Sequence, residues 1–355
     1  MVGFSSTAAD IATELAGTAK KIYLSHRRGN NIVRTILNHF NAFLNIHQLP
    51  RVIKNRPLDQ SLNRRAAGMK SLAFATAPLF TVKQMDKFVA KMCDDAWKGR
   101  LLSEWSLKPA PSLTFSRPII SDTLVPVLEN GTVESVSSIR KFNSSQTIEL
   151  NDGSTISANA IIFCTGYRKD KILSTVVPSD EHDSFPHLYQ NIFPPEDANS
   201  LAYMTHWYLS AGISESADLI GMAIAQVFAG RYILPSKAKM YFEIDRHKDT
   251  LQSLVNYVQG SIPQDAMENW VDEGPWRAFL QSAAGTGVNE KLGYGWEGWN
   301  FWWNERELCN LLMTGVDSPH VQRLFKGRSG GRLKWHGALE AIKRANQEVS
   351  QLAKG

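Results

Sequence analysis

A turn of small residues near the start of the chain is the first segment whose residue types fit a known chemistry. The turn comprises Gly3, Ser5, Ser6, Thr7 and Ala8. Strong helix formers continue it through residues 8–16, and such a strand–turn–helix lets a phosphate approach the free N–H groups at the helix start. In the pattern Gly-x-Gly-x-x-Gly, Gly3 takes the tight-turn position, while Ser5 and Ala8 replace the other glycines. Taken alone, the turn fits a dinucleotide site and a plain structural turn equally well.

Two arginines follow the next predicted strand. Residues 21–25 include Ile, Tyr and Leu and predict a short strand, and His26, Arg27 and Arg28 come directly after it. Units that bind NAD usually place an acid about 20 residues after the glycine turn, where it contacts a ribose hydroxyl. Guanidinium groups at that point would pair instead with the additional phosphate of NADP. The sequence therefore favours NADP at this turn, with a solvated basic loop as the alternative.

The elements around these residues are predicted from their apolar patterns. The first helix is expected to begin at a Ser6 or Thr7 cap and to end at Gly17. Residues 33–43 put apolar side chains on one helical face, so a second helix is predicted there. The basic, partly aromatic segment 51–117 is expected to be mainly helical. Basic residues interleaved with aromatic ones can bind nucleic acid, but a helical insertion or lid is the commoner explanation.

Strand-like sequence follows this helical region. Residues 132–136 and 147–150 alternate between apolar and polar side chains, and an Asn-Asp-Gly turn after them predicts a hairpin. Residues 160–164 form a continuous apolar run, typical of a central parallel strand. That run ends in Thr165 and Gly166. Because open α/β sheets bind ligands where their strands end, these two residues are candidates for a site.

Composition narrows the classes of function. The chain has 355 residues, of which 43% are hydrophobic and 21% charged, so it can bury a core and is not mainly disordered. Its net charge of +5 suits an anionic cofactor as well as a nucleic acid. No apolar run approaches the ~20 residues of a membrane span. The three cysteines and nine histidines lack disulfide or metal-ligand spacing, so we expect no metal and a cytoplasmic location.

Tryptophan is concentrated towards the C-terminus, where seven of the ten tryptophans follow residue 260. An aromatic cage for a cation is one interpretation. Core packing of a helical extension is favoured, because Trp296, Trp299 and Trp302 have helix-like spacing. His206 and His320 have no acid–base partner nearby in the sequence, so they are interpreted as structural or surface residues.

Three segments in a fixed order carry a family resemblance: residues 2–12, 24–29 and 161–167. Together they resemble flavin-containing monooxygenases, and most closely the fungal dimethylaniline monooxygenase-like group. Three further segments fit the same group, namely residues 188–195, 229–236 and 318–320. The resemblance extends over nearly the whole chain.

The resemblance implies a flavin-dependent monooxygenase that uses FAD, NADPH and oxygen. Its substrate would be a small organic molecule oxygenated at nitrogen or sulfur, or a ketone in Baeyer–Villiger relatives. By the same resemblance, the NADP pyrophosphate turn would contain Gly3, Ser5, Ser6, Thr7 and Ala8. Arg27 or Arg28 would contact the 2′-phosphate, and Thr165 and Gly166 would lie where the two cofactors meet. No catalytic residue is assigned.

The family also implies an α/β fold with a distinct division of the chain. Residues 1–53 and 118–172 would form a Rossmann-like NADP-binding domain whose first strand is mostly missing, interrupted by a helical insertion at 54–117. Residues 173–236 would be the remainder of an FAD-binding domain. Residues 237–355 would be a helical, Trp-rich extension.

The sequence departs from the family in one important respect. It contains no Gly-x-Gly-x-x-Gly fingerprint for FAD, and Val2 alone represents the first strand of the NADP unit. We therefore expect an N-terminally truncated chain. A catalytically inactive NADP-binding remnant, or an incomplete gene product, is the alternative. A flavin disulfide reductase is less favoured, because the three cysteines supply no local redox pair.

Overall fold

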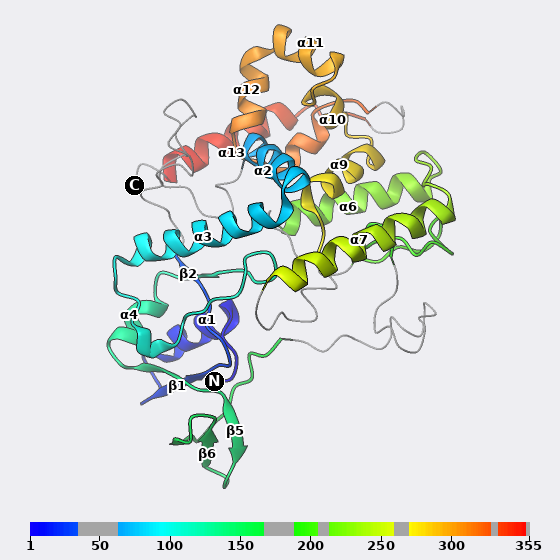
Figure 1. The fold of residues 1–355 in the computed structure, drawn as a ribbon. Helices are drawn as coiled ribbons and strands as arrows, with labels where there is room; N and C mark the ends of the chain where they lie inside the picture. The colour runs from blue at the N-terminus through cyan, green and yellow to red at the C-terminus, as the bar shows by residue number, and fades with distance from the viewer. Residues whose placement is uncertain (35–62, 167–187, 205–212, 259–269, 328–332, 353–355) are drawn as a thin grey trace. The chain divides into compact units, whose positions relative to one another are not determined.

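The computed structural model describes the chain except residues 35–62, 167–187, 205–212, 259–269, 328–332 and 353–355. It divides into two compact units (Figure 1). The first unit contains the described residues between Met1 and Leu37 and between Val82 and Asp170. The second unit contains the other described residues. The described part is a mixture of helices and small sheets, which agrees with an α/β protein.

Short parallel strands form the centre of the first unit. Strand β1 (Ile22–Ser25) pairs in parallel with β4 (Val133–Val136), with Ile22 opposite Val133. Val2 forms parallel bridges to Ser25 on one side and to Phe163 on the other. The predicted strands at 21–25 and 132–136 are therefore confirmed, and Val2 connects β1 to the 160–164 segment.

The segment 160–164 is not the doubly buried strand that its composition predicts. It contributes only an isolated bridge at Phe163, whose side chain is 66% exposed. Ile161 is exposed as well, whereas Cys164 is buried. Successive side chains of extended backbone point to opposite faces. Within the described part of the chain, other residues pack against only one face of this segment. The prediction of burial on both faces is therefore wrong.

Helix α1 (Ser6–Leu15) packs on this sheet through its smallest residues. Ala8, Ala9 and Ala12 are fully buried, in one core cluster with Leu24. Alanine has little side chain, so the helix backbone approaches the strand closely. The helix is confirmed, but its cap differs from the prediction. Because the helix already begins at Ser6, Ser5 is the N-cap, and its side chain makes no capping hydrogen bond.

The remaining elements of the first unit complete its core. Strand β2 (Ile32–Val33) pairs in parallel with β3 (Ile119–Ile120), and helix α4 (Leu124–Glu129) follows. Val33 is thus in a strand rather than in the helix predicted at 33–43, because the β-branched pair at 32–33 is buried against β3. Residues 35–43 of that prediction lie outside the described residues.

Two long helices confirm the helical character predicted between residues 51 and 117. They are α2 (Arg64–Thr76), in the second unit, and α3 (Pro78–Trp97), which enters the first unit at Val82. A 3-10 turn, η2 (Ser103–Trp105), follows. The buried indole N–H of Trp97 donates to the carbonyl of Ile32 at 3.0 Å and anchors α3 beside β2.

A three-stranded antiparallel sheet follows β4. Its strands are β5 (Ile139–Phe142), β6 (Thr147–Leu150) and β7 (Thr155–Ser157), in the order β5-β6-β7. The predicted hairpin is confirmed, and Gly153 in its turn has a φ of +85° that glycine adopts readily.

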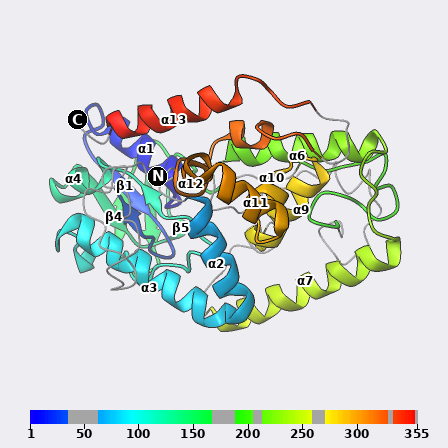
Figure 2. The same cartoon turned by 90° about the horizontal axis from the view of Figure 1, so that it is seen from above.

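Helices dominate the second unit. In chain order, the further elements are α6 (Ile213–Phe228), α7 (Lys237–Tyr257), α9 (Glu273–Ala283), α10 (Val288–Lys291), α11 (Trp296–Asn304), α12 (Arg306–Thr314), η3 (Pro319–Arg323) and α13 (Ala338–Leu352). Figure 2 shows α9 beside α6, where Leu219 and Ile220 of α6 and Leu280 of α9 share a buried cluster. A second cluster includes Val288 and Ile342.

The tryptophans of the second unit divide into two groups. Trp270 and Trp276 are buried, as the core-packing interpretation predicts. Trp296 and Trp303 of α11 are 84% and 79% exposed, and Trp299 is exposed too. Their spacing places them on one helical face, and none of the described residues buries that face. The core-packing interpretation is therefore wrong for Trp296 and Trp299, whereas Trp302 of the same helix is half-buried.

Candidate functional site

Gly3 lies where the strands of the first unit end. Its N–H donates to the Ser25 carbonyl at 3.0 Å, and Cys164 N–H donates to the Val2 carbonyl at 2.7 Å. Gly3 has a φ of +108°, and a β-carbon there would lie 2.5 Å from the Cys164 carbonyl oxygen. Both the backbone conformation and the close approach therefore require glycine at this position.

The start of α1 is open to an anion. Ser5, Ser6 and Thr7 are exposed, and the first turn of the helix contains no acidic side chain. The first backbone N–H groups of an α-helix have no partner within the helix, and the helix dipole favours negative charge there. Ala8 is buried under this turn. The predicted turn residues thus combine a close backbone approach with accessible donors.

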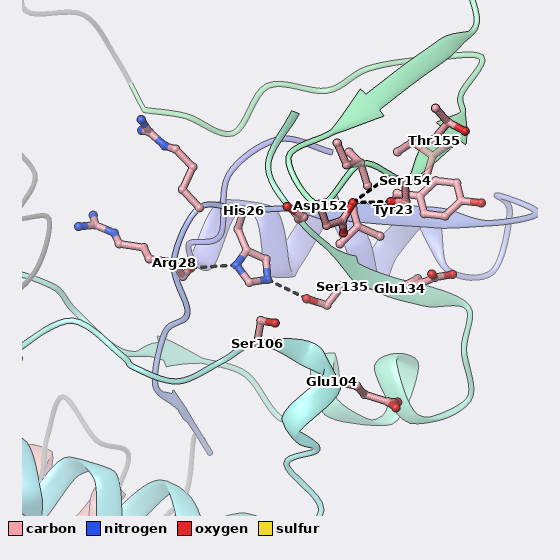
Figure 3. Close-up of a pocket in the computed structure, with 15 residues that line it drawn as sticks. Tyr23, His26, Arg28, Glu104, Ser106, Glu134, Ser135, Asp152, Ser154 and Thr155 are labelled. Carbon is pink, nitrogen blue, oxygen red and sulfur yellow. Dashed lines mark hydrogen bonds between the residues drawn. The ribbon is translucent and has the colours of Figure 1, made fainter. Parts of the chain in front are cut away.

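Arg27 and Arg28 line a cavity of about 640 Å³ at the end of β1 (Figure 3). Arg27 is exposed and Arg28 half-buried. Lining groups also come from η2, from β4 and from the β6–β7 turn, including Glu104, Glu134 and Asp152. In Figure 3 the Arg28 side chain extends away from Glu134 and Asp152, so the cavity has a basic end and an acidic end.

His26 is a buried member of this cavity wall. Its ring stacks on Phe4 with 4.7 Å between centroids and 22° between planes. Its Nδ1 lies 2.9 Å from the Arg28 carbonyl oxygen and its Nε2 lies 2.7 Å from Ser135 Oγ, and both contacts are drawn as dashed lines in Figure 3. Ser135 Oγ in turn donates to the Trp105 carbonyl at 2.7 Å. Burial lowers the pKa of His26, while its hydrogen bonds to carbonyl groups act in the opposite direction.

Thr165 and Gly166 are exposed directly after Cys164. A β-carbon on Gly3 would lie 3.4 Å from the Thr165 nitrogen, which places this pair at the glycine turn. Gly166 has a φ of +86°. Burial raises the pKa of the Cys164 thiol, so this cysteine is a packing residue rather than a nucleophile.

A family model described as flavin-binding monooxygenase-like matches residues 1–275. The chain belongs to this family. It is 32% identical over 356 residues to monooxygenase aurF of Gibberella zeae, an alignment that covers 96% of this chain and 62% of that protein. It is 24% identical to flavin-containing monooxygenase 5 of Homo sapiens over 96% of this chain and 56% of that protein. The chain thus spans only about three-fifths of the length of these curated relatives.

For this member of the flavin-binding monooxygenase-like family, the structure brings two groups of predicted residues into one unit. Gly3, the start of α1 and the Thr165–Gly166 pair lie at the ends of the parallel strands. Arg27 and Arg28 line the neighbouring cavity. Gly3 is absent from that cavity's lining, and the stacked pair of Phe4 and His26 connects the two groups.

Sequence reasoning missed His26 and its partners. His26 was visible only as the residue before two arginines, and Ser135 lies 109 positions further along the chain. His206 lies outside the described residues, and His320 is half-buried beside Trp335. In the described ranges, no group of His, Cys, Asp or Glu side chains could hold a metal ion. The helices of the same ranges include none long and apolar enough to cross a membrane.

The second unit contains a buried ionic cluster. Arg277 donates to Glu215 at 2.7 Å and pairs with Asp317 at 2.5 Å, and Gln322 donates to the same Glu215 oxygen at 3.0 Å. Burial raises the pKa of Glu215 to about 7. The cluster joins α6, α9 and η3, and the space beside it is too small for a ligand.

Proposed function

We propose that this chain belongs to a flavin-dependent monooxygenase that takes its electrons from NADPH and oxygenates the nitrogen or sulfur of a small organic molecule. One observation carries the proposal: a glycine turn with an open helix start lies beside a cavity with two arginines at the end of the next strand. The names of the curated relatives support the monooxygenase part of the proposal.

The residues at this turn fit NADPH. A β-carbon on Gly3 would collide with the Cys164 carbonyl, so the turn can lie this close to the strand ends only with glycine. The exposed first turn of α1 offers N–H donors to a pyrophosphate. Arg27 and Arg28 can pair with the 2′-phosphate, and Thr165 and Gly166 can border the nicotinamide end. When bound, NADPH supplies a hydride. The role of these residues is to hold and orient the dinucleotide.

The residues do not fit FAD in the same way. In the described ranges, the turn at Gly3 is the only one that joins parallel-paired backbone, here the bridges of Val2, to a helix through a glycine. No step of flavin chemistry is therefore assigned to the described residues. The domain division that accompanies the proposal places NADP on residues 1–53 and 118–172, an insertion at 54–117, FAD-domain sequence at 173–236 and a helical extension at 237–355.

A titration with NADP⁺ and NAD⁺ tests the proposal. Each phosphate contact of an arginine contributes about 1.5–3 kcal/mol, so the double variant Arg27→Ala/Arg28→Ala should bind NADP⁺ roughly 100-fold more weakly or worse. NAD⁺ affinity should change little. The matched control is Lys83→Ala/Lys87→Ala, which removes two exposed charges of α3 in the same unit. Equal affinity for both dinucleotides, before and after the arginine change, would contradict the 2′-phosphate assignment.

A further inference from the structure

His26 is the side chain through which the two parts of the proposed NADP site touch. Its ring stacks on Phe4, the residue after Gly3, at 4.7 Å. Its Nδ1 donates to the carbonyl of Arg28 at 2.9 Å. His26 as a whole is only 9% exposed. A single buried side chain therefore contacts both the glycine turn and the backbone of the arginine pair.

The hydrogen-bond network around His26 contains three contacts and so needs three protons. They lie between Nδ1 and the Arg28 oxygen at 2.9 Å, between Nε2 and Ser135 Oγ at 2.7 Å, and between Ser135 Oγ and the Trp105 oxygen at 2.7 Å. A neutral imidazole and a hydroxyl hold only two protons between them. If the Ser135 hydroxyl donates to Nε2, the Trp105 oxygen loses that donor.

Protonation of the ring completes the network. An imidazolium donates from Nδ1 to Arg28 and from Nε2 to Ser135, which frees the hydroxyl proton for Trp105. Hydrogen bonding thus favours the charged ring, while burial opposes it and lowers the pKa of His26. These opposing effects make the charge on His26 sensitive to any further charge that enters the site.

The cavity already contains charges of both signs. Its titratable and charged lining groups, besides His26, are Tyr23, Arg27, Arg28, Glu104, Glu134 and Asp152. Glu134 is paired with Lys21 at 2.8 Å. A nucleotide 2′-phosphate bound at the arginine end would add up to two negative charges beside the imidazole, and a nearby negative charge favours the protonated form.

We propose that His26 is a positioning residue of the dinucleotide site, and that its Nε2 takes up one proton from solvent when a nucleotide phosphate binds beside Arg27 and Arg28. The charged ring then holds the Arg28 carbonyl, the Ser135 hydroxyl and, through stacking, the Gly3 turn in one arrangement. The inference rests on the proposed function, because the phosphate concerned is that of NADP.

Calorimetry of the 355-residue chain tests the inference. NADP⁺ and NAD⁺ are titrated at pH 7 in two buffers of different ionisation enthalpy, so that the difference in heat gives the protons taken up on binding. The wild type should take up protons with NADP⁺ and not with NAD⁺. His26→Gln should lose this uptake and bind NADP⁺ about tenfold more weakly at pH 6.5 than the wild type, the equivalent of about 1.4 kcal/mol. The two affinities should converge by pH 8.5.

Two further variants keep the result interpretable. Ser135→Ala removes the hydroxyl that bridges His26 Nε2 and the Trp105 carbonyl but keeps the imidazole, so it should lose most of the proton uptake even if His26→Gln folds poorly. His247→Gln is the matched control, because the half-buried His247 also stacks on an aromatic ring, that of Trp270, but lies in the second unit. The 2′-phosphate itself titrates near pH 6 in every variant, so the comparison between variants isolates His26.

The outcomes separate the inference from the proposed function. Tight NADP⁺ binding with equal proton uptake in the wild type, His26→Gln and Ser135→Ala would overturn the inference and leave the proposed function standing. A wild type that binds neither dinucleotide would overturn both. Proton uptake that disappears in the His26 and Ser135 variants, and persists in His247→Gln, would establish it.

Discussion

Replacing Gly3 with alanine should destabilise the first unit more than the same replacement at any of its other glycines with positive φ. Holding a residue with a β-carbon at a φ of +108° costs on the order of 1–3 kcal/mol. The new β-carbon would also lie 2.5 Å from the Cys164 carbonyl oxygen, and displacing packed backbone costs roughly another 1–3 kcal/mol. We therefore expect Gly3→Ala to lower the free energy of unfolding by about 2–6 kcal/mol.

Gly131→Ala separates these two contributions. Gly131 also has a positive φ, +74°, but a β-carbon there has no neighbour within 4 Å. Its loss should stay near 1 kcal/mol, the ordinary cost of the left-handed conformation. Urea denaturation followed by circular dichroism measures both variants, and NADP⁺ titration shows whether the turn still binds. If Gly3→Ala were no less stable than Gly131→Ala, the close approach of the turn to Cys164 would be refuted.

Three further predictions concern the second unit and the cofactors. Arg277→Met should cost about 3–5 kcal/mol in urea denaturation, because it removes the cation that pairs with the buried Glu215 and the half-buried Asp317, and a loss below 1 kcal/mol would contradict this. Since burial raises the pKa of Glu215 from 4.5 to about 7, the folded protein binds this proton more tightly than the unfolded chain. Stability should therefore fall between pH 4.5 and 7, and Glu215→Gln should flatten that slope in melting curves. The purified chain should show no flavin absorbance and oxidise no NADPH, whereas stoichiometric FAD would show that the flavin-binding residues have been misjudged.

Local features of the first unit were predictable because their causes lie within a few residues. The alanine-rich run specified α1, the β-forming residues 21–25 specified β1, and the Asn-Asp-Gly turn specified the β6–β7 hairpin. For these three elements, propensity or turn chemistry determines the local backbone. The assignment of Arg27 and Arg28 to a 2′-phosphate rests on their distance from the glycine turn and stays a prediction.

The features that the sequence did not predict depend on which segments pack against a strand or helix, or on hydrogen-bond partners far away in the sequence. An apolar run such as 160–164 has the same composition whether one or both of its faces are covered, so its exposure could not be deduced. The same holds for the tryptophan face of α11. The hydrogen bonds of His26 reach Ser135, 109 positions away, and no local pattern indicates that pairing.

The bridges of Val2 have a consequence for the order in which the protein folds. Val2 pairs with Ser25 and with Phe163, so the strand end that carries Gly3 is completed only when segments from both ends of the first unit meet. Closing so long a loop costs more entropy than the local pairing of a hairpin, and contacts of high sequence separation form slowly. During synthesis, the glycine turn must wait until residue 164 has left the ribosome. We therefore expect the β5-β6-β7 sheet to form early and the Gly3 turn late, with the amide of Cys164 among the last to gain protection from hydrogen exchange during refolding.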